Sequence, residues 1–249
     1  MFLLFLCAAS LCVCIMIGGY IAQYESFRRK EIIVGAIRPY NYEPDSHVSA
    51  SVVQVAGFYP KWKEIKGGNL VETIYRGVSL VFCDLLLSHI KGSGRTKKKH
   101  TDFEGTFMMI ECHRWIEHAI SIEERERPVR SVCQEGIQTE NEAFNQRFEI
   151  KSDDLMEAMN VLTPRFMEKL MEADAYADAR TCVKLLGNQI FVMLYNQKRL
   201  FGFESASTDE AYFCACLNDL EYILGFADIL LENDALFDQS RITAKEAQG

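Results

Sequence analysis

The stretch Val78–Lys91, VSLVFCDLLLSHIK, is the starting point for predicting the fold. It is rich in β-branched and other apolar residues, which favours an extended strand. The next regular stretch, Thr101–His113 (TDFEGTFMMIECH), alternates partly between apolar and polar residues. The polar segment GSGRTKKKH at residues 92–100 separates the two and contains two glycines. Together they predict a long antiparallel hairpin.

Further strand patterns follow along the chain. After a polar interval that reaches about Asn141, Ala143–Lys151 (AFNQRFEIK) places Phe144, Phe148 and Ile150 in a strand-like pattern. Thr181–Tyr195 predicts a second hairpin, with Gly187-Asn188 as its two-residue turn. Leu200–Glu204 predicts a short additional strand.

Two helices are expected between these strands, and a third after them. Ser152, Asp153 and Asp154 predict the start of a helix that runs to about Val161, because acidic residues are favourable in the first turn of a helix. Thr163 followed by Pro164 is typical of the start of the second. Ser207 and Glu210 have the spacing of a capping box for the third. Its expected apolar stripe is Phe213, Leu217, Leu220, Leu224, Ala227 and Leu231. The fold class predicted is α+β: antiparallel β-hairpins, a central helix pair and a long C-terminal amphipathic helix.

The first 22 residues, MFLLFLCAASLCVCIMIGGYIA, carry no charge. At about 1.5 Å per residue they span roughly 30 Å, the hydrocarbon thickness of a bilayer. Signal peptides have a basic first region and a small-x-small cleavage site, and this run lacks a convincing example of either. We expect one transmembrane helix over residues 1–24, with a cleaved signal and an exported domain as the alternative. Arg28, Arg29 and Lys30 then determine the topology, because basic residues flank the cytoplasmic end of membrane helices.

These patterns divide the chain into four parts. Residues 1–24 are the anchor, 25–60 a juxtamembrane connector, 61–238 a cytoplasmic α+β domain and 239–249 a frayed tail. The helix of the anchor is expected to continue through Tyr24–Ile37, until Pro39 stops it.

Charge and composition limit the function. The formal net charge is −8, and residues 205–249 hold nine acids against two bases. Such a balance argues against a nucleic-acid partner. The acids of the C-terminal helix are either the solvated side of a helix packed on the core or a face for a basic protein partner. The nine cysteines lack the spacing of a disulfide scaffold, which is compatible with a reducing compartment.

A basic cluster at the expected hairpin loop is the clearest charged feature: Arg95, Lys97, Lys98 and Lys99, followed by His100. It is either a solvated loop or a contact for anionic lipid headgroups, to which each basic residue contributes about 1 kcal/mol. Other residues that commonly form metal or nucleotide sites do not have the spacing that such sites require. His113 and His118 are five apart, Cys214 and Cys216 would diverge on a helix, and neither nucleotide fingerprint occurs. The sequence thus predicts no catalytic residue, cofactor or metal ligand.

The motifs FEGTF at Phe103–Phe107, FNQRFEIKSDD at Phe144–Asp154 and VLTPRFMEKL at Val161–Leu170 resemble a bacterial domain-of-unknown-function family. IRPYNYEP (Ile37–Pro44) and FYPKW (Phe58–Trp62) fit the same order. The resemblance covers about Arg28–Phe237. It implies a bacterial inner-membrane protein, with two hydrophobic helices before a cytoplasmic α+β domain. This chain departs from the pattern by showing one such helix; the other is either missing or lies upstream of the given start.

Two classes of function follow. The first is a membrane-anchored, non-enzymatic interaction or regulatory module on the cytoplasmic face of the inner membrane. The second is a membrane-surface enzyme whose site is assembled only in the fold. A deep pocket with convergent polar groups of perturbed pKa would favour the enzyme.

Overall fold

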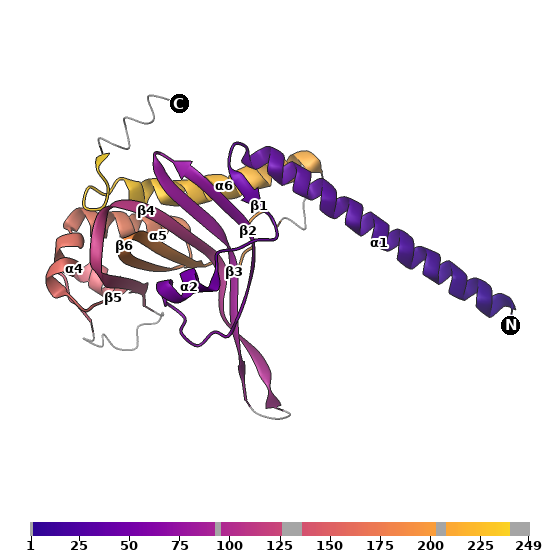
Figure 1. The fold of residues 1–249 in the computed structure, drawn as a ribbon, viewed down its shortest axis with the longest axis horizontal. Helices are drawn as coiled ribbons and strands as arrows, with labels where there is room; N and C mark the ends of the chain where they lie inside the picture. Colours follow the sequence, from indigo (N-terminus) through magenta and orange to yellow (C-terminus); the bar gives the residue numbers. More distant parts are fainter. Residues whose placement is uncertain (1, 93–95, 126–135, 203–207, 240–249) are drawn as a thin grey trace.

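The computed structural model describes residues 2–92, 96–125, 136–202 and 208–239. In the first helix, it describes side chains from residue 16 on, except at 18, 21, 22 and 26. Figure 1 shows an α+β body from which one long helix extends. The predicted combination of an antiparallel sheet with a C-terminal helix is confirmed.

Six antiparallel strands form one sheet in this body. The strand order is β1 (Asn41–Glu43), β2 (Glu64–Tyr75), β3 (Val78–Lys91), β4 (Lys98–Glu124) and β5 (Phe148–Ser152). The sixth strand, β6 (Arg180–Tyr195), pairs with the other edge of β4. The predicted hairpin is confirmed, because β3 and β4 pair from Leu80–Ile110 out to Lys91–Lys98. Lys98, Lys99 and His100, expected in the loop, are in the strand.

Strand β4 is twice as long as expected. It runs on through the interval that we predicted as polar and irregular, and Ile116, Ile120 and Ile122 are fully buried there. The register of its pairing with β6 shifts between Glu111 and Ile116 and again before Ile120. Such bulges interrupt the two-residue alternation by which a strand is recognised in a sequence.

The second predicted hairpin is wrong, because β6 is continuous. Gly187 has φ of +63°, as a turn would need, but it lies opposite Ile116 within the ladder. A side chain here would lie 3.7 Å from the ring of Trp115. The glycine therefore serves a bulge and not a turn. The short strand expected at Leu200–Glu204 is also absent over 200–202, and its remainder lies outside the described residues.

Local capping signals located the helices well. Helices α4 (Leu155–Val161) and α5 (Pro164–Ala177) begin after Asp154 and Thr163, whose side chains accept hydrogen bonds from Glu157 N and Phe166 N. The strand expected from Ala143 is wrong in its first half: α3 (Glu142–Arg147) occupies it, capped by Asn141, and β5 begins only at Phe148.

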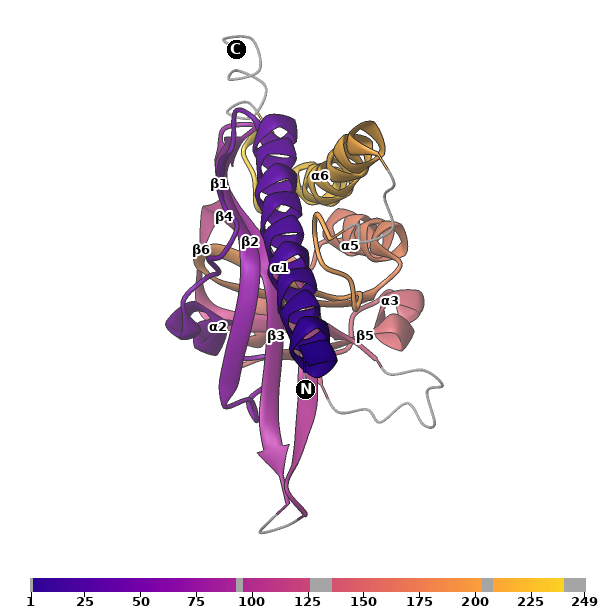
Figure 2. The ribbon, with the colours of Figure 1, turned by 90° about the vertical axis from the view of Figure 1, so that its right-hand side faces the viewer.

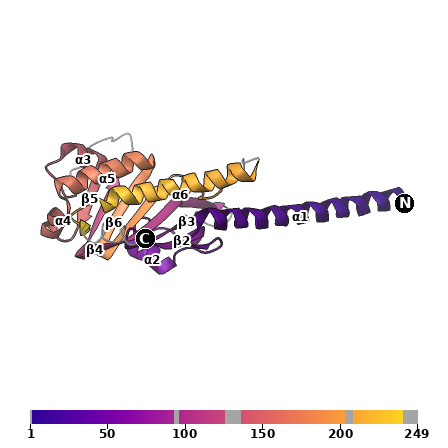
Figure 3. The same ribbon diagram turned by 90° about the horizontal axis from the view of Figure 1, so that it is seen from above.

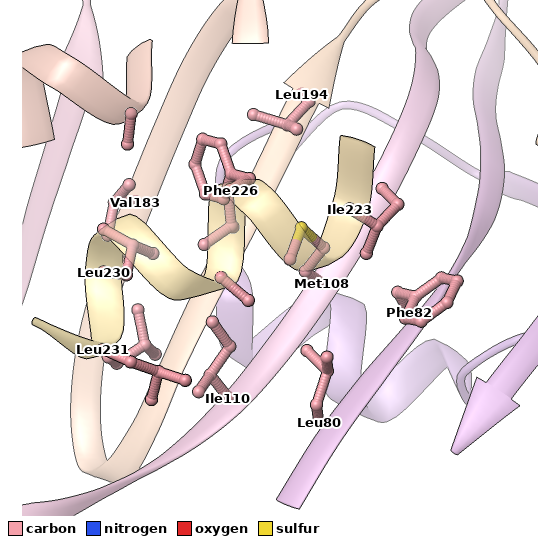
Figure 4. Close-up of a cluster of buried hydrophobic side chains, with 14 of the residues drawn as sticks. Leu80, Phe82, Met108, Ile110, Val183, Leu194, Ile223, Phe226, Leu230 and Leu231 are labelled. Atoms are coloured by element: carbon pink, nitrogen blue, oxygen red, sulfur yellow. The ribbon is translucent and has the colours of Figure 1, made fainter. Parts of the chain in front are cut away.

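The long helix α6 (Asp209–Leu231) lies across one face of the sheet (Figures 1 and 3). Thr208 caps it, and Ser207 lies outside the described residues. Figure 4 shows Ile223, Phe226, Leu230 and Leu231 of α6 against side chains of β3, β4 and β6. The predicted stripe was shifted in its first half: Phe213 and Leu217 are more than a third exposed, while Tyr212 and Cys216 are buried.

The other face of the sheet carries a second, smaller core under α2 (Ala50–Ala56). Alternate side chains of β3 point into the two cores. Leu80 and Phe82 face α6, whereas Cys83, Leu85 and Leu87 face α2. The element β1 and the helix α2, both within the predicted connector, thus contribute to the sheet and its packing.

Helix α1 (Phe2–Ile37) extends from the domain as an uninterrupted helix (Figures 2 and 3). It ends two residues before Pro39, as expected from the missing amide donor. Ile33, Ala36 and Ile37, in its last turn and a half, are buried in the same core as α6. The C-terminal end of α1 is therefore an integral part of the domain.

Candidate functional site

The junction of α1 with the domain is built from apolar contacts and then surrounded by charges. Ile37 is 1% exposed and Ile33 5%, and α1 packs directly on α6. Burial of two isoleucines stabilises the docked helix by a few kcal/mol, about 1.5–3 kcal/mol for each full burial. The direction of α1 is consequently fixed relative to the sheet.

The three predicted topology residues all engage the domain. Arg28 forms an ion pair with Asp209 in the first turn of α6, and the Arg29 guanidinium lies 5.8 Å from the centre of the Tyr212 ring. Lys30 Nζ lies 2.8 Å from Asp45 Oδ2. These pairs are largely exposed and contribute little to stability. A hollow of about 340 Å³ lies beside α1, and Arg29, Lys30, Tyr42 and Tyr212 help to line it.

The predicted basic cluster lies at the free end of the β3–β4 hairpin. Lys97, Lys98 and Lys99 are exposed, and Arg95 lies outside the described residues. Lys99 Nζ contacts Glu64 Oε2 at 2.6 Å, whereas no ion pair is described for Lys97 or Lys98. Pairing of Lys98 with Lys91 across the strands, beside the exposed Ile90, gives the hairpin end a basic and partly apolar surface.

The hairpin and α1 project from the domain in diverging directions, and both have a downward component in Figure 1. Figures 1 and 2 show the hairpin projecting beyond the rest of the sheet, at the bottom of both views. In the same views α1 descends from its junction with the domain toward its N-terminal end. Both projections therefore extend downward in these views, at an angle to each other.

A buried carboxylate holds the segment after β6 against the sheet. Both oxygens of Asp84 lie 3.0 Å from the donating backbone N–H of Leu200, and Asn69 Nδ2 donates to Oδ2 at 2.8 Å. Asn69 adopts a φ of +57° at the bulge of β2, and its Nδ2 donates to Leu200 O as well. Burial raises the pKa of Asp84 to about 7.

Asp84 lines a cavity of about 350 Å³, together with Lys66, Glu104, Lys198 and Arg199. This is a polar pocket with a perturbed acid, the feature that an enzyme would need. The Asp84 carboxylate is already engaged by Leu200 and Asn69, however, so its geometry is that of a structural clamp. Gly105, the centre of the FEGTF motif, lines the same cavity where β4 closely approaches Leu194 and Asn196.

A second buried charge cluster connects α5, β4 and α3. Arg147 pairs with Asp174, and its Nη2 lies 3.4 Å from Glu124 Oε1. Asp174 is 1% exposed, and its pKa is raised by burial and by the charge of Glu124, against the lowering effect of Arg147 and Thr181. Thr181 N donates to Glu124 Oε2 at 3.2 Å. Arg147 therefore lies between two largely buried carboxylates, those of Asp174 and Glu124.

The histidines and cysteines with unsuitable spacing have separate roles. His113 Nδ1 accepts a hydrogen bond from Asp238 N, while His118 contacts Glu157 on α4. Cys214 is exposed and Cys216 buried, so the two thiols of α6 diverge as expected.

Sequence reasoning missed a cluster of His89, His100 and Asp102. Their nitrogen and oxygen atoms lie within 4.8 Å of one another at the base of the projecting hairpin. Its signal was present, since His100 ends the polar segment at residues 92–100 and His89 lies three residues before that segment. The strand register that brings them together could not be inferred from spacing alone.

The fold and these sites define an α+β domain with an antiparallel sheet and two helix-covered cores, joined rigidly to an N-terminal helix. The chain belongs to the family described as "Protein of unknown function (DUF3137)", which matches residues 101–231, just over half of its length. The expected resemblance to a domain-of-unknown-function family is confirmed in this respect. In the part of the chain that the structure describes, no helix combines the length and apolarity needed to cross a membrane.

One similar solved structure is the crystal structure of the mycobacterial trehalose monomycolate transport factor A, TtfA. It is 12% identical, with 82% of this chain and 94% of that chain covered and a TM-score of 0.36. The comparison with curated proteins found no match.

Proposed function

We propose that this protein is a membrane-anchored interaction or regulatory module of the bacterial inner membrane. Residues 1–24 are its anchor, the N-terminus is outside and the α+β domain is cytoplasmic. The observation that supports this most is the continuity of α1: the uncharged run at residues 1–22 precedes a segment whose last residues are buried in the domain. An anchor of this kind holds the domain at a set orientation to the bilayer, without a flexible linker.

A second membrane contact follows from that orientation. With α1 in the bilayer, the basic end of the hairpin is directed toward the surface that α1 enters. Lys97, Lys98 and Lys91 would then lie near anionic headgroups, with Ile90 at the interface. Anchor and hairpin would together fix the face that the domain presents to a protein partner.

Replacing Val13 and Ile15 by arginine tests the anchor. Each charge near the centre of a membrane helix opposes insertion by about 2.5–3.5 kcal/mol. We expect the wild-type chain to remain in the membrane fraction after alkaline extraction, and the double variant to be released. The matched control replaces Gln23 and Tyr24, beyond the uncharged run, by arginine and should stay in the membrane. A wild-type chain that is extracted like a peripheral protein contradicts the proposal.

The orientation has its own test. A reporter fused after Gly249 that is active only in the cytoplasm should be active, and one that is active only in the periplasm should be silent. The opposite pattern would place the domain outside, as expected for an exported protein. Recovery of a shortened N-terminus from cells would identify cleavage of a signal.

A further inference from the structure

The neck of the projecting hairpin brings together three side chains that commonly bind metals. His89 Nδ1 lies 2.8 and 2.7 Å from the two carboxylate oxygens of Asp102. His100 Nδ1 lies 3.7 Å from Asp102 Oδ1, and the two imidazole rings are 5.1 Å apart between centroids. All three residues thus present ligand atoms to one small volume.

The strand register builds this arrangement. His89 on β3 is directly opposite His100 on β4, so their side chains leave the sheet on the same face. The register shifts between Leu87, opposite Phe103, and Ser88, opposite Thr101. Asp102 is the extra residue of that bulge, and the bulge turns its carboxylate toward His89.

The environment is that of a site with one open side. The side chains of Asp102 and His89 are 10% and 18% exposed, while that of His100 is 57% exposed. His89 is on the face of β3 that carries Leu85 and Leu87, so the site borders the smaller core under α2. The protein therefore surrounds one flank of the cluster and leaves the other accessible to an ion from solvent.

We propose that His89, His100 and Asp102 bind a divalent transition-metal ion of the zinc class. Two neutral imidazoles and a carboxylate are ligands that Zn²⁺ accepts, and three protein ligands leave a fourth position for water. With metal–ligand bonds of about 2.0–2.2 Å, tetrahedral ligand atoms are separated by roughly 3.4 Å. The separations of 2.7 Å and 3.7 Å from the Asp102 carboxylate fall on either side of that value, and all three ligand atoms lie within 4.8 Å of one another, so an ion enters once the side chains adjust around it.

A bound ion would crosslink the two strands where the hairpin leaves the sheet. His89 comes from β3, and the other two ligands come from β4. The crosslink would stiffen the segment that carries Lys91 and Lys98, next along the same strands. The site thus goes beyond the proposed membrane attachment, and it can be tested without lipid.

The experiment titrates Co²⁺ into the purified full chain in an uncharged detergent. We expect one equivalent to produce the visible absorption of a tetrahedral site, and Zn²⁺ to displace it. His100→Ala and Asp102→Asn should each weaken Co²⁺ binding by at least about tenfold, since loss of even an outer-shell partner costs 10–100-fold. His118→Ala is the matched control, because His118 is also an exposed strand histidine beside a carboxylate.

The variants also exclude a folding defect. His100 is exposed, so His100→Ala should retain the far-ultraviolet circular dichroism and melting temperature of the metal-free protein. Zn²⁺ should raise the melting temperature of the wild type and of His118→Ala, but not of His100→Ala. Failure to bind one equivalent overturns the proposal, as does equal affinity in all variants. Thiolate charge-transfer bands that persist in His100→Ala would place the metal on cysteines, and this result would overturn it too.

Discussion

Arg28 of α1 and Asp209 of α6 form an ion pair between residues 181 positions apart in the chain. The pair lies at the mouth of the junction that fixes α1 to the domain, and Ile33 and Ile37 are buried beneath it. Both charged side chains are about half exposed. Their contribution to the free energy of unfolding should therefore be small compared with that of the isoleucines.

Ile37→Ala should lower the free energy of unfolding by about 2–5 kcal/mol, because it leaves a cavity in the core between α1 and α6. Arg28→Gln should cost less than about 1 kcal/mol. Thermal and denaturant unfolding of the full chain in neutral detergent measures both. Val34→Ala, at an exposed position of the same helix, is the control. Equal effects of Ile37→Ala and Val34→Ala would show that α1 is not held by this packing.

Lys97→Gln combined with Lys98→Gln should weaken attraction to an anionic membrane. At about 1 kcal/mol per basic residue, the pair contributes about 2 kcal/mol, or roughly thirtyfold in binding. Residues 25–249, which lack the uncharged run, would be floated with phosphatidylglycerol vesicles at low salt. The control removes two basic residues elsewhere, Lys151→Gln with Arg165→Gln. Equal losses in the two double variants would mean that net charge, not the hairpin, governs binding.

The sequence predicted those parts of the fold that depend on local signals. The strand predicted at Val78–Lys91 has those bounds in the structure, and α5 begins at Pro164 after the Thr163 cap, as expected. The second half of β4 was missed because register shifts around Ile116 disrupt its alternation. Gly187 was assigned to a turn because positive φ serves turns and bulges alike, and only the neighbouring strand distinguishes them.

The candidate sites divide in the same way. A run of like charges such as Lys97–Lys99 is visible in a sequence without any knowledge of pairing. Asp84 is different, since its contact is with Leu200, 116 residues away. In the sequence, the apolar residues around Asp84 make it resemble a polar interruption of a strand. The histidine cluster depends on one bulge at Asp102. The sequence patterns therefore failed to locate the sites whose residues are brought together by strand pairing or by contacts distant in the chain.

Asp84→Asn should flatten the pH dependence of stability. Burial raises the pKa of Asp84 from 3.8 to about 7, so the folded state binds this proton more tightly than the unfolded state. The stabilisation is complete below pH 3.8 and is lost as the pH rises through about 7. The wild type should therefore lose a few kcal/mol over that interval, at about 1.4 kcal/mol per unit of pKa shift.

Denaturant midpoints of the full chain across this pH interval measure the effect, with Asp45→Asn as control. Asp45 lines the same cavity but is largely exposed, so its replacement should leave the slope unchanged. Identical slopes for wild type and Asp84→Asn would mean that the Asp84 carboxylate stays ionised throughout, stabilised by Leu200 and Asn69.

Arg147→Met should be the most damaging of these substitutions. It removes the guanidinium that pairs with the buried Asp174 carboxylate and lies near Glu124, and removal of one partner of a buried pair costs about 3–5 kcal/mol. A second substitution, Asp174→Asn, removes the carboxylate charge that has lost Arg147 and should restore part of the loss. Unfolding of the single and double variants by denaturant measures this coupling. Arg165→Met, which breaks the exposed pair with Asp234, is the control and should cost less than about 1 kcal/mol. If Arg147→Met costs no more than this control, the ion pair with Asp174 does not stabilise the fold, and Arg147 only packs beside the two carboxylates.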